Sequence, residues 1–182
     1  LTEQYGLTVG NAYATADLGF MAVDTTGQLG GMRLLPEPVI QVVDPDTGQS
    51  VGPGEAGEVV VTSLSQSYPL IRFGTGDMAV NFDPAPGSSR QEERAIVLVG
   101  RSGEAIKVRG MFVHPNQLRF AAQQVVPFTA IQGVVTRPET RDYFTVRITS
   151  AEIDQSSPEL GERLKEHIQA VCRVRVDEVQ FV

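Results

Sequence analysis

Cysteine, lysine and long apolar runs are scarce in this sequence of 182 residues. Its single cysteine, Cys172, excludes an intrachain disulfide and any thiolate cluster for zinc or iron–sulfur, and we expect it to be a buried helix residue. The longest clear apolar run, residues 95–99, is far shorter than the ~20 residues that a membrane-spanning helix needs. We therefore expect a cytoplasmic protein that has no membrane partner.

Positive charge is scarce as well. Lysine and arginine total 15 against 22 aspartates and glutamates, so the formal net charge is −7. A nucleic-acid partner would require a cationic face that displaces counterions from phosphate, and this balance argues against one. The two histidines, His114 and His167, lack the matching carboxylates of a zinc site. We expect the first to be structural and the second to be solvated.

Both ends of the sequence look cut. It starts at Leu1 without a methionine or a signal-peptide pattern, and it stops at Val182 within an alternating strand pattern. We therefore expect a piece of a longer protein. A change in composition predicts two domains, residues 1–100 and 101–182.

Short β-like runs separated by Gly, Pro and Asp fill the first domain. Residues 39–43 and 58–62 read as strands, and residues 44–48 between them read as a tight turn. The spacing predicts an antiparallel, barrel-like subdomain. Residues 83–94 have the composition of a loop and are expected to form a mobile excursion.

The second domain alternates strands and helices, which predicts an α+β fold of the ferredoxin-like kind. Pro115 and Pro158 suit the first turn of a helix, Ser157 can cap the second helix, and apolar side chains follow both at helical spacing. The expected order is strand, helix, strand, strand, helix, strand, with strands at 106–112, 131–136, 143–148 and 174–182. A further strand at 94–100 is expected directly before the domain boundary.

Two short segments place acidic groups where the backbone can approach a ligand. In residues 13–17, the ring of Tyr13 and the carboxylate of Asp17 could stack a base and hold a divalent cation near its phosphates. The alternative is an ordinary surface loop. In residues 69–77, two glycines allow close approach and Asp77 could accept two hydrogen bonds from a ribose diol. The alternative there is a plain turn.

A third segment, residues 100–110, carries three cations. Arg101 can make forked bonds to phosphate or ribose oxygens, as a lysine cannot. Lys107, one of only two lysines, and Arg109 are expected on one face of a single strand. The alternative is a hairpin with solvated charges.

The order and spacing of these segments resemble the phenylacetate–CoA ligase-like branch of the adenylate-forming acyl-CoA ligase superfamily. Residues 13–17 resemble its aromatic-Gly-x-Thr-Glu segment, residues 70–77 its Arg-Thr-Gly-Asp segment, and residues 100–115 its domain-hinge segment with the strand that follows. The resemblance covers essentially the whole chain. It implies an enzyme that adenylates a carboxylic acid, expected to be aromatic, with ATP and then transfers the acyl group to coenzyme A.

The resemblance also implies a role for each residue of the nucleotide site. Tyr13 would stack on adenine, Asp17 would hold Mg²⁺ near the phosphates, and Asp77 would bind the ribose hydroxyls of ATP or AMP. Arg101 would reach the ribose or a phosphate. Thr15 would substitute for a phosphate-binding hydroxyl that the family carries at the next position.

A second set of residues would act with coenzyme A. Rotation of the small domain between the two half-reactions would bring Lys107 and Arg109 to the site, where Gly110 would line the pantetheine passage. Gly103 stands where the hinge segment usually carries an aspartate, and Asp17 replaces the usual glutamate. Relatives of this kind suggest a homodimer.

The sequence contains no catalytic residue of this family. It has no Gly/Ser/Thr-rich phosphate loop, and neither Lys107 nor Lys165 lies in the Gly-Lys context of the lysine that drives adenylation. We therefore expect the chain alone to be inactive. The alternatives are an enzyme on the same scaffold with a different acyl acceptor or no remaining chemistry, and a non-catalytic module that binds a small molecule.

Overall fold

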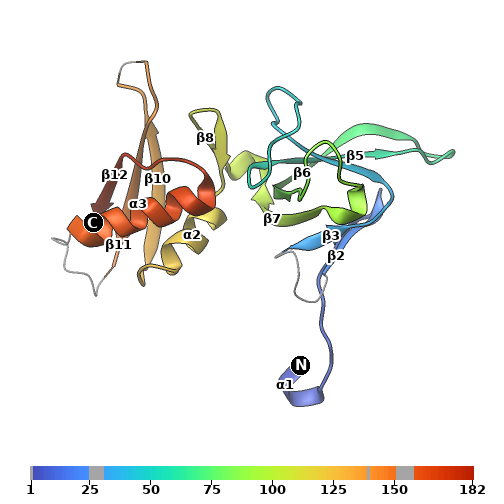
Figure 1. The fold of residues 1–182 in the computed structure, drawn as a ribbon, viewed down its shortest axis with the longest axis horizontal. Coiled ribbons are helices and arrows are strands. Elements are labelled where there is room, and N and C mark those ends of the chain that lie inside the picture. The colour runs from blue at the N-terminus through green and yellow to red at the C-terminus, as the bar shows by residue number, and fades with distance from the viewer. Residues whose placement is uncertain (1, 25–30, 139, 151–157) are drawn as a thin grey trace. The chain divides into compact units, whose positions relative to one another are not determined.

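The computed structural model describes residues 2–24, 31–138, 140–150 and 158–182 (Figure 1). The chain divides into two units. The first comprises the residues up to Pro53 together with Gly57–Leu98, and the second comprises Gly54–Ala56 and Val99–Val182. Within the described ranges, no helix is long and apolar enough to span a membrane.

A seven-stranded sheet forms the first unit. Its strands lie in the order β1-β2-β3-β7-β6-β5-β4, so β1 and β4 are its two edges. Because these edges do not pair, the described residues form no closed sheet, and the barrel-like part of the prediction is not confirmed. The elements are α1 (Thr2–Tyr5), β1 (Ala12–Thr15), β2 (Gly19–Asp24), β3 (Met32–Leu34), β4 (Val39–Val43), β5 (Ala56–Ser63), β6 (Leu70–Phe82), the 3-10 turn η1 (Gln91–Glu93) and β7 (Ala95–Arg101).

Cross-strand apolar pairs build the core of the first unit. β4 and β5 pair in antiparallel register, with Ile40 opposite Val61 and Val42 opposite Val59, and all four side chains are buried. Burial of such side chains stabilises each by about 1.5–3 kcal/mol relative to exposure. The strands predicted at 39–43 and 58–62 are therefore confirmed.

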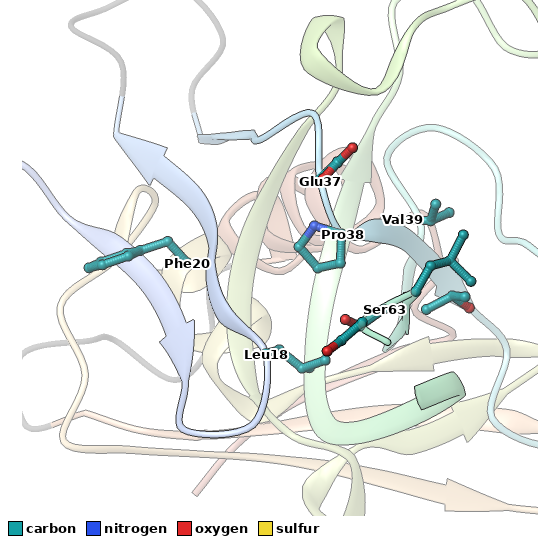
Figure 2. Close-up of a pocket in the computed structure, with 9 residues that line it drawn as sticks. Leu18, Phe20, Glu37, Pro38, Val39 and Ser63 are labelled. Carbon is teal, nitrogen blue, oxygen red and sulfur yellow. The ribbon is translucent and has the colours of Figure 1, made fainter. Parts of the chain in front are cut away.

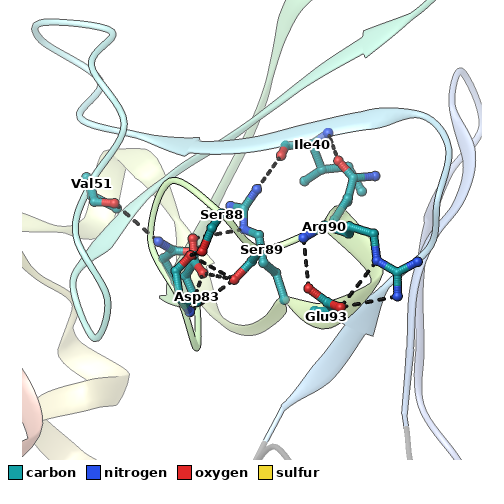
Figure 3. A network of polar contacts seen from close by, with 11 residues as sticks. Ile40, Val51, Asp83, Ser88, Ser89, Arg90 and Glu93 are labelled. Atoms are coloured by element: carbon teal, nitrogen blue, oxygen red, sulfur yellow. Dashed lines mark hydrogen bonds and ion pairs between the residues drawn. The ribbon is translucent and has the colours of Figure 1, made fainter.

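Hydrogen bonds hold the loop between β6 and β7, which was predicted to be a mobile excursion (Figure 3). The hydroxyl of Ser89 donates to Asp83 Oδ1 at 2.6 Å. The amide of Gln91 donates to two main-chain carbonyls of residues 35–38 at 2.6 Å each, and its oxygen accepts from the Ile40 N–H at 2.8 Å. These partners lie about fifty positions away in sequence, so local composition could not reveal them.

The second unit contains a three-stranded sheet and two helices, α2 and α3, that pack against one of its faces (Figure 1). A separate two-stranded hairpin precedes them. The elements are the 3-10 turn η2 (Ser102–Glu104), β8 (Ile106–Val108), β9 (Met111–Val113), α2 (Pro115–Gln123), β10 (Ala130–Thr136), β11 (Tyr143–Thr149), α3 (Pro158–Cys172) and β12 (Glu178–Phe181). The α+β class is confirmed.

Strand pairing in the second unit differs from the expected ferredoxin-like arrangement. The order is β10-β11-β12, with β11 antiparallel to β10 and parallel to β12. The connection through α3 returns the chain beside β11, as a parallel crossover requires. The predicted single strand at 106–112 is wrong, because this segment contains two short strands, β8 and β9, that pair with each other as an antiparallel hairpin.

The helices bury the apolar stripes that the sequence predicts. Leu118, Ala121 and Ala122 of α2 and Leu164 and Ile168 of α3 are buried in one core with the sheet. The cap predicted at residue 157 lies outside the described residues.

Cys172 is buried at the end of α3, as predicted. Burial raises the pKa of its thiol to about 12, which keeps it protonated and unreactive.

Candidate functional site

Two predicted site residues meet in the first unit. The hydroxyl of Tyr13 on β1 donates to Oδ2 of Asp77 on β6 at 2.9 Å, across 64 positions of sequence. The ring of Tyr13 is 6% exposed and belongs to the apolar core. Its polar end therefore reaches the carboxylate, while little of its ring face is open to a base.

The main chain around Asp77 is fixed from the neighbouring strand β5. Thr75 donates its hydroxyl hydrogen to the carbonyl of Val59 at 2.9 Å and accepts from the Asp77 N–H at 3.2 Å. The N–H of Gly76, where φ is +73°, donates to Oε1 of Glu58 at 3.0 Å. The predicted alternative of a plain turn is wrong, since this segment lies within the thirteen-residue strand β6.

Gly74 departs from the Arg-Thr-Gly-Asp segment at its first residue, which the sequence reasoning did not note. A Cβ at this position would lie 2.8 Å from Oε1 of Glu58. The carboxylate of Glu58 thus occupies the space where a side chain at residue 74 would begin. The same carboxylate accepts the hydrogen bond from the N–H of Gly76, next to Asp77.

A tight hairpin turn carries Thr15 and Asp17. Thr15 pairs with Gly19, whose φ is +70°, and its Oγ1 accepts from the Leu18 N–H at 3.3 Å. Because the Thr15 hydroxyl oxygen acts as an acceptor in this hydrogen bond, its hydrogen can still be donated to another group. Asp17 is exposed at the tip of the turn. Among the described residues, no three His, Cys, Asp or Glu side chains gather as a metal site.

An open hollow of about 570 Å³ lies beside this turn (Figure 2). Leu18 and Phe20 line it together with the Glu37–Val39 segment and residues 62–65 at the end of β5. Several of these apolar side chains are exposed, with Phe20 at 63% and Leu64 at 79%. Neither Tyr13 nor Asp77 lines this hollow, so it is distinct from the place where those two residues meet.

The hinge segment begins with a close approach between Gly100 and His114. A Cβ on Gly100, where φ is +147°, would overlap Cε1 and Nε2 of the buried His114 ring. His114 also caps α2, because its Nδ1 accepts from the Asn116 N–H at 3.2 Å. Arg101 follows as an exposed residue at the end of β7, and Gly103 lies in η2 with open space around it.

The protonation of His114 is expected to make stability depend on pH. Burial lowers the pKa of His114 from 6.5, although Glu104, whose Oε2 lies 3.2 Å from Nε2, acts in the opposite direction. The unfolded chain therefore binds more protons than the folded chain below pH 6.5. This contribution to stability is present above that pH and is lost as the pH falls through the lowered pKa.

Urea unfolding at about pH 7 and about pH 5 measures this effect. We expect His114→Asn, which keeps a good capping side chain, to lose less free energy of unfolding between these pH values than the wild type does. His167→Asn on α3 is the matched control and should behave as the wild type. An equal pH dependence in His114→Asn and the wild type would rule out this role.

The β8–β9 hairpin places the remaining predicted residues. Nζ of Lys107 lies over the ring of its cross-strand partner Phe112, 4.9 Å from the centroid. Gly110 is exposed in the turn with a φ of +86°. Arg109 also lies in this turn, not on a strand face with Lys107, and its guanidinium contacts acceptors of its own unit. The backbone of residues 106–113 therefore forms the hairpin that was predicted as the alternative.

Sequence reasoning missed the supporting residues of these sites. Glu58, Gln91 and the acceptors of Arg109 act through partners distant in sequence, and no local pattern indicates them. His114 directly precedes Pro115, so its place at the start of a helix could be predicted from the sequence. No local pattern indicates that its ring packs on Gly100.

Curated relatives of this chain are phenylacetate-coenzyme A ligases. The chain is 34% identical over 116 residues to the protein of that name from Thermus thermophilus, a match that covers 62% of this chain and 26% of the relative. It is 35% identical over 79 residues to the one from Pseudomonas putida, covering 43% of this chain and 17% of the relative. The matches thus span about a quarter of the relatives' length or less. No family model matches the chain.

Two solved structures with the same fold are CoA ligases. An open conformation of 2-hydroxyisobutyryl-CoA ligase, in complex with 2-HIB-AMP and CoA, matches all of this chain and 41% of its own with a TM-score of 0.73 and 21% identity. The anthranilate CoA ligase AuaEII in complex with anthranoyl-AMP matches all of this chain and 37% of its own, with a TM-score of 0.55 and 18% identity. Together, the sequence and fold similarities confirm the resemblance of this chain to the phenylacetate–CoA ligase-like branch of the adenylate-forming superfamily.

Proposed function

We propose that the protein to which this chain belongs is an AMP-forming ligase that joins an aromatic carboxylic acid to coenzyme A. A carboxylate oxygen attacks the α-phosphorus of ATP and pyrophosphate leaves; the thiol of coenzyme A then attacks the acyl carbon and AMP leaves. A free carboxylate resists a thiol because its leaving group is poor, and the anhydride with AMP supplies a good one. The hydrogen bond between Tyr13 and Asp77 carries this proposal, because it joins two of the three motifs.

In the first unit, Asp77 would bind the ribose hydroxyls of the nucleotide. An ionised carboxylate offers only acceptors, which suits a diol, and the contacts of Tyr13 and Thr75 hold it before the nucleotide arrives. Thr15 would donate to a phosphate. Asp17 would bind Mg²⁺, whose other ligands would be phosphate oxygens and water, as is usual for this ion. Adenine stacking by Tyr13 stays a prediction.

In the second unit, Arg101 would contact the ribose or a phosphate after the hinge has turned. Lys107 and Gly110 lie on one hairpin, which would approach the site in the second half-reaction, with Gly110 beside the pantetheine arm. Gly103, whose surroundings are open, would permit the backbone change that a hinge must absorb. The predicted homodimer and cytoplasmic location stay predictions.

We expect the chain alone to release no pyrophosphate from ATP and an aromatic acid, because it carries neither the phosphate loop nor the Gly-Lys segment. The test of the proposal therefore uses a longer protein that contains both. Formation of a CoA thioester over a panel of aromatic acids supports the proposal. Pyrophosphate release without a thioester would indicate another acceptor, and no reaction at all would favour a binding module.

Asp77→Asn in that longer protein is expected to weaken ATP binding by about 1.5–3 kcal/mol, the scale of hydrogen bonds to a charged group. This corresponds to roughly a 10- to 150-fold higher Kd. Calorimetric titration with a non-hydrolysable ATP analogue measures it. Asp24→Asn makes the same charge change at an exposed end of β2 and should leave the affinity unchanged. Equal affinities of Asp77→Asn and the wild type contradict the ribose role.

A further inference from the structure

The turn of the β8–β9 hairpin has an unusual residue at its first position. Two residues, Arg109 and Gly110, connect Val108 to Met111, and their φ angles are +50° and +86°. A two-residue hairpin turn with two positive φ angles suits Asn-Gly or Gly-Gly, whereas the backbone of an arginine is strained in this region. The surrounding contacts must therefore hold Arg109 in place.

Acceptors from two distant segments surround Arg109. Its N–H donates to Oδ2 of Asp142 at 2.8 Å. Its guanidinium donates to the carbonyls of Arg175 at 2.7 Å and Asp142 at 3.0 Å, and to a carboxylate oxygen of Asp177. These partners lie 33 to 68 positions away in sequence. Such a forked set requires the planar group of arginine, which a lysine cannot replace.

The two carboxylates are themselves fixed to the sheet. Asp142 accepts from Nε and Nη2 of Arg137 at 2.8 and 2.7 Å. The hydrogen bond from the Arg109 N–H, and then those from Arg137, lower the pKa of Asp142. Asp177 accepts from the N–H of Phe144 at 2.7 Å and donates its own N–H to the Phe144 carbonyl at 2.9 Å. The hairpin turn is thus tied to the start of β11 and to the segment before β12.

We propose that Arg109 is a positioning residue for the transfer of the acyl group to coenzyme A, acting through the β8–β9 turn and not by contact with the ligand. This rests on the proposed function. Its guanidinium is turned toward Asp177 and two carbonyls of its own unit, so it fixes the turn that presents Gly110 and the strand that carries Lys107. The resemblance predicted a ligand contact for Arg109; the contacts favour support of the turn.

Arg109→Gln and Arg109→Lys in the longer protein test this inference. We expect each to slow acyl transfer from preformed acyl-adenylate to coenzyme A by roughly 10²-fold, the scale of a small misplacement of reacting groups. Pyrophosphate release in the adenylation step should stay close to that of the wild type. Arg119→Gln, the same change at an exposed arginine of α2, is the matched control and should leave both half-reactions unchanged.

Arg109→Lys distinguishes a positioning role from a ligand contact, since lysine keeps the positive charge but cannot make the several hydrogen bonds of the guanidinium. Acyl transfer near the wild-type rate in Arg109→Lys, with a loss confined to Arg109→Gln, would overturn the proposal in favour of a phosphate contact. An equal loss in both half-reactions, or a loss in neither, would also overturn it.

Amide hydrogen exchange on the 182-residue chain tests the anchor independently of any activity. Asp142→Asn and Arg109→Gln should speed exchange at the turn residues 109 and 110, while the β10–β11 ladder stays protected. If the longer protein forms no thioester, the proposed function fails and the exchange result still decides the anchor. Unchanged exchange at the turn in both variants would overturn it.

Discussion

Gly100→Ala is expected to destabilise the second unit by about 2–6 kcal/mol, from two separate causes of about 1–3 kcal/mol each. The φ of +147° is a conformation that side chains other than glycine rarely adopt. In addition, the new Cβ would overlap Cε1 and Nε2 of the His114 ring. An effect of this size from one methyl group is large, because the whole free energy of folding is typically 5–15 kcal/mol.

The overlap cannot be relieved by moving His114. The ring is fully buried, and its Nδ1 caps α2 by accepting from the Asn116 N–H. The main-chain N–H of His114 donates to Oε1 of Gln117 at 3.0 Å. Asn116 in turn donates from Nδ2 to the carbonyl of Val99 at 2.8 Å. The first residues of the hinge segment and the start of α2 therefore form one packed structure.

Urea unfolding followed by far-UV circular dichroism measures the loss, and a double-mutant cycle with His114→Ala separates its causes. In the His114→Ala background, Gly100→Ala should cost only the backbone strain. Gly103→Ala is the control, since its Cβ would meet nothing within 4 Å, and it should change stability by no more than about 0.5 kcal/mol. A Gly100→Ala protein as stable as Gly103→Ala would disprove the close approach.

The regular elements could be predicted because their signals are local. Apolar residues at helical spacing, with a proline in the first turn, indicated α2 and α3, and apolar runs bounded by turns indicated β4, β5, β10 and β11. The β8–β9 hairpin was predicted only as an alternative to a single strand, because Arg109-Gly110 is not a usual sequence for a turn with two positive φ angles. Contacts of Arg109 with Asp142 and Asp177, both distant in sequence, help to hold this turn.

The arrangement of the sheets depends on distant contacts, which the sequence does not display. Nothing in residues 174–182 indicates that β12 pairs in parallel with β11, and nothing in the first unit indicates that its sheet stays open. For the site, the motifs indicated Tyr13 and Asp77 separately, and the family resemblance alone united them. Their hydrogen bond and the support from Glu58 emerge only from the fold.

Phe144→Ala is expected to lower the free energy of unfolding by about 3–5 kcal/mol, as for other buried aromatic residues. Phe144 is fully buried in the core of the second unit, where it is the largest completely buried side chain among the described residues. Its backbone also exchanges two hydrogen bonds with Asp177, which hold β11 in place, so the neighbours cannot collapse fully into the space that the ring leaves. Phe120→Ala on α2, where the ring is 57% exposed, is the matched control and should cost less than about 1 kcal/mol.

A second substitution tests whether the ring lies where the structure has it. On β10, a Cβ added to Gly133 would lie 3.0 Å from Cε2 of Phe144 and 3.2 Å from Cδ1 of Ile106. Gly133→Ala should therefore destabilise the wild type by crowding this ring, and it should cost less in the Phe144→Ala background, where the crowding is gone. Contacting residues of this kind couple by about 0.5–3 kcal/mol. Strictly additive losses would show that Phe144 does not pack against Gly133, whereas coupling of this sign places the ring against Gly133 of β10.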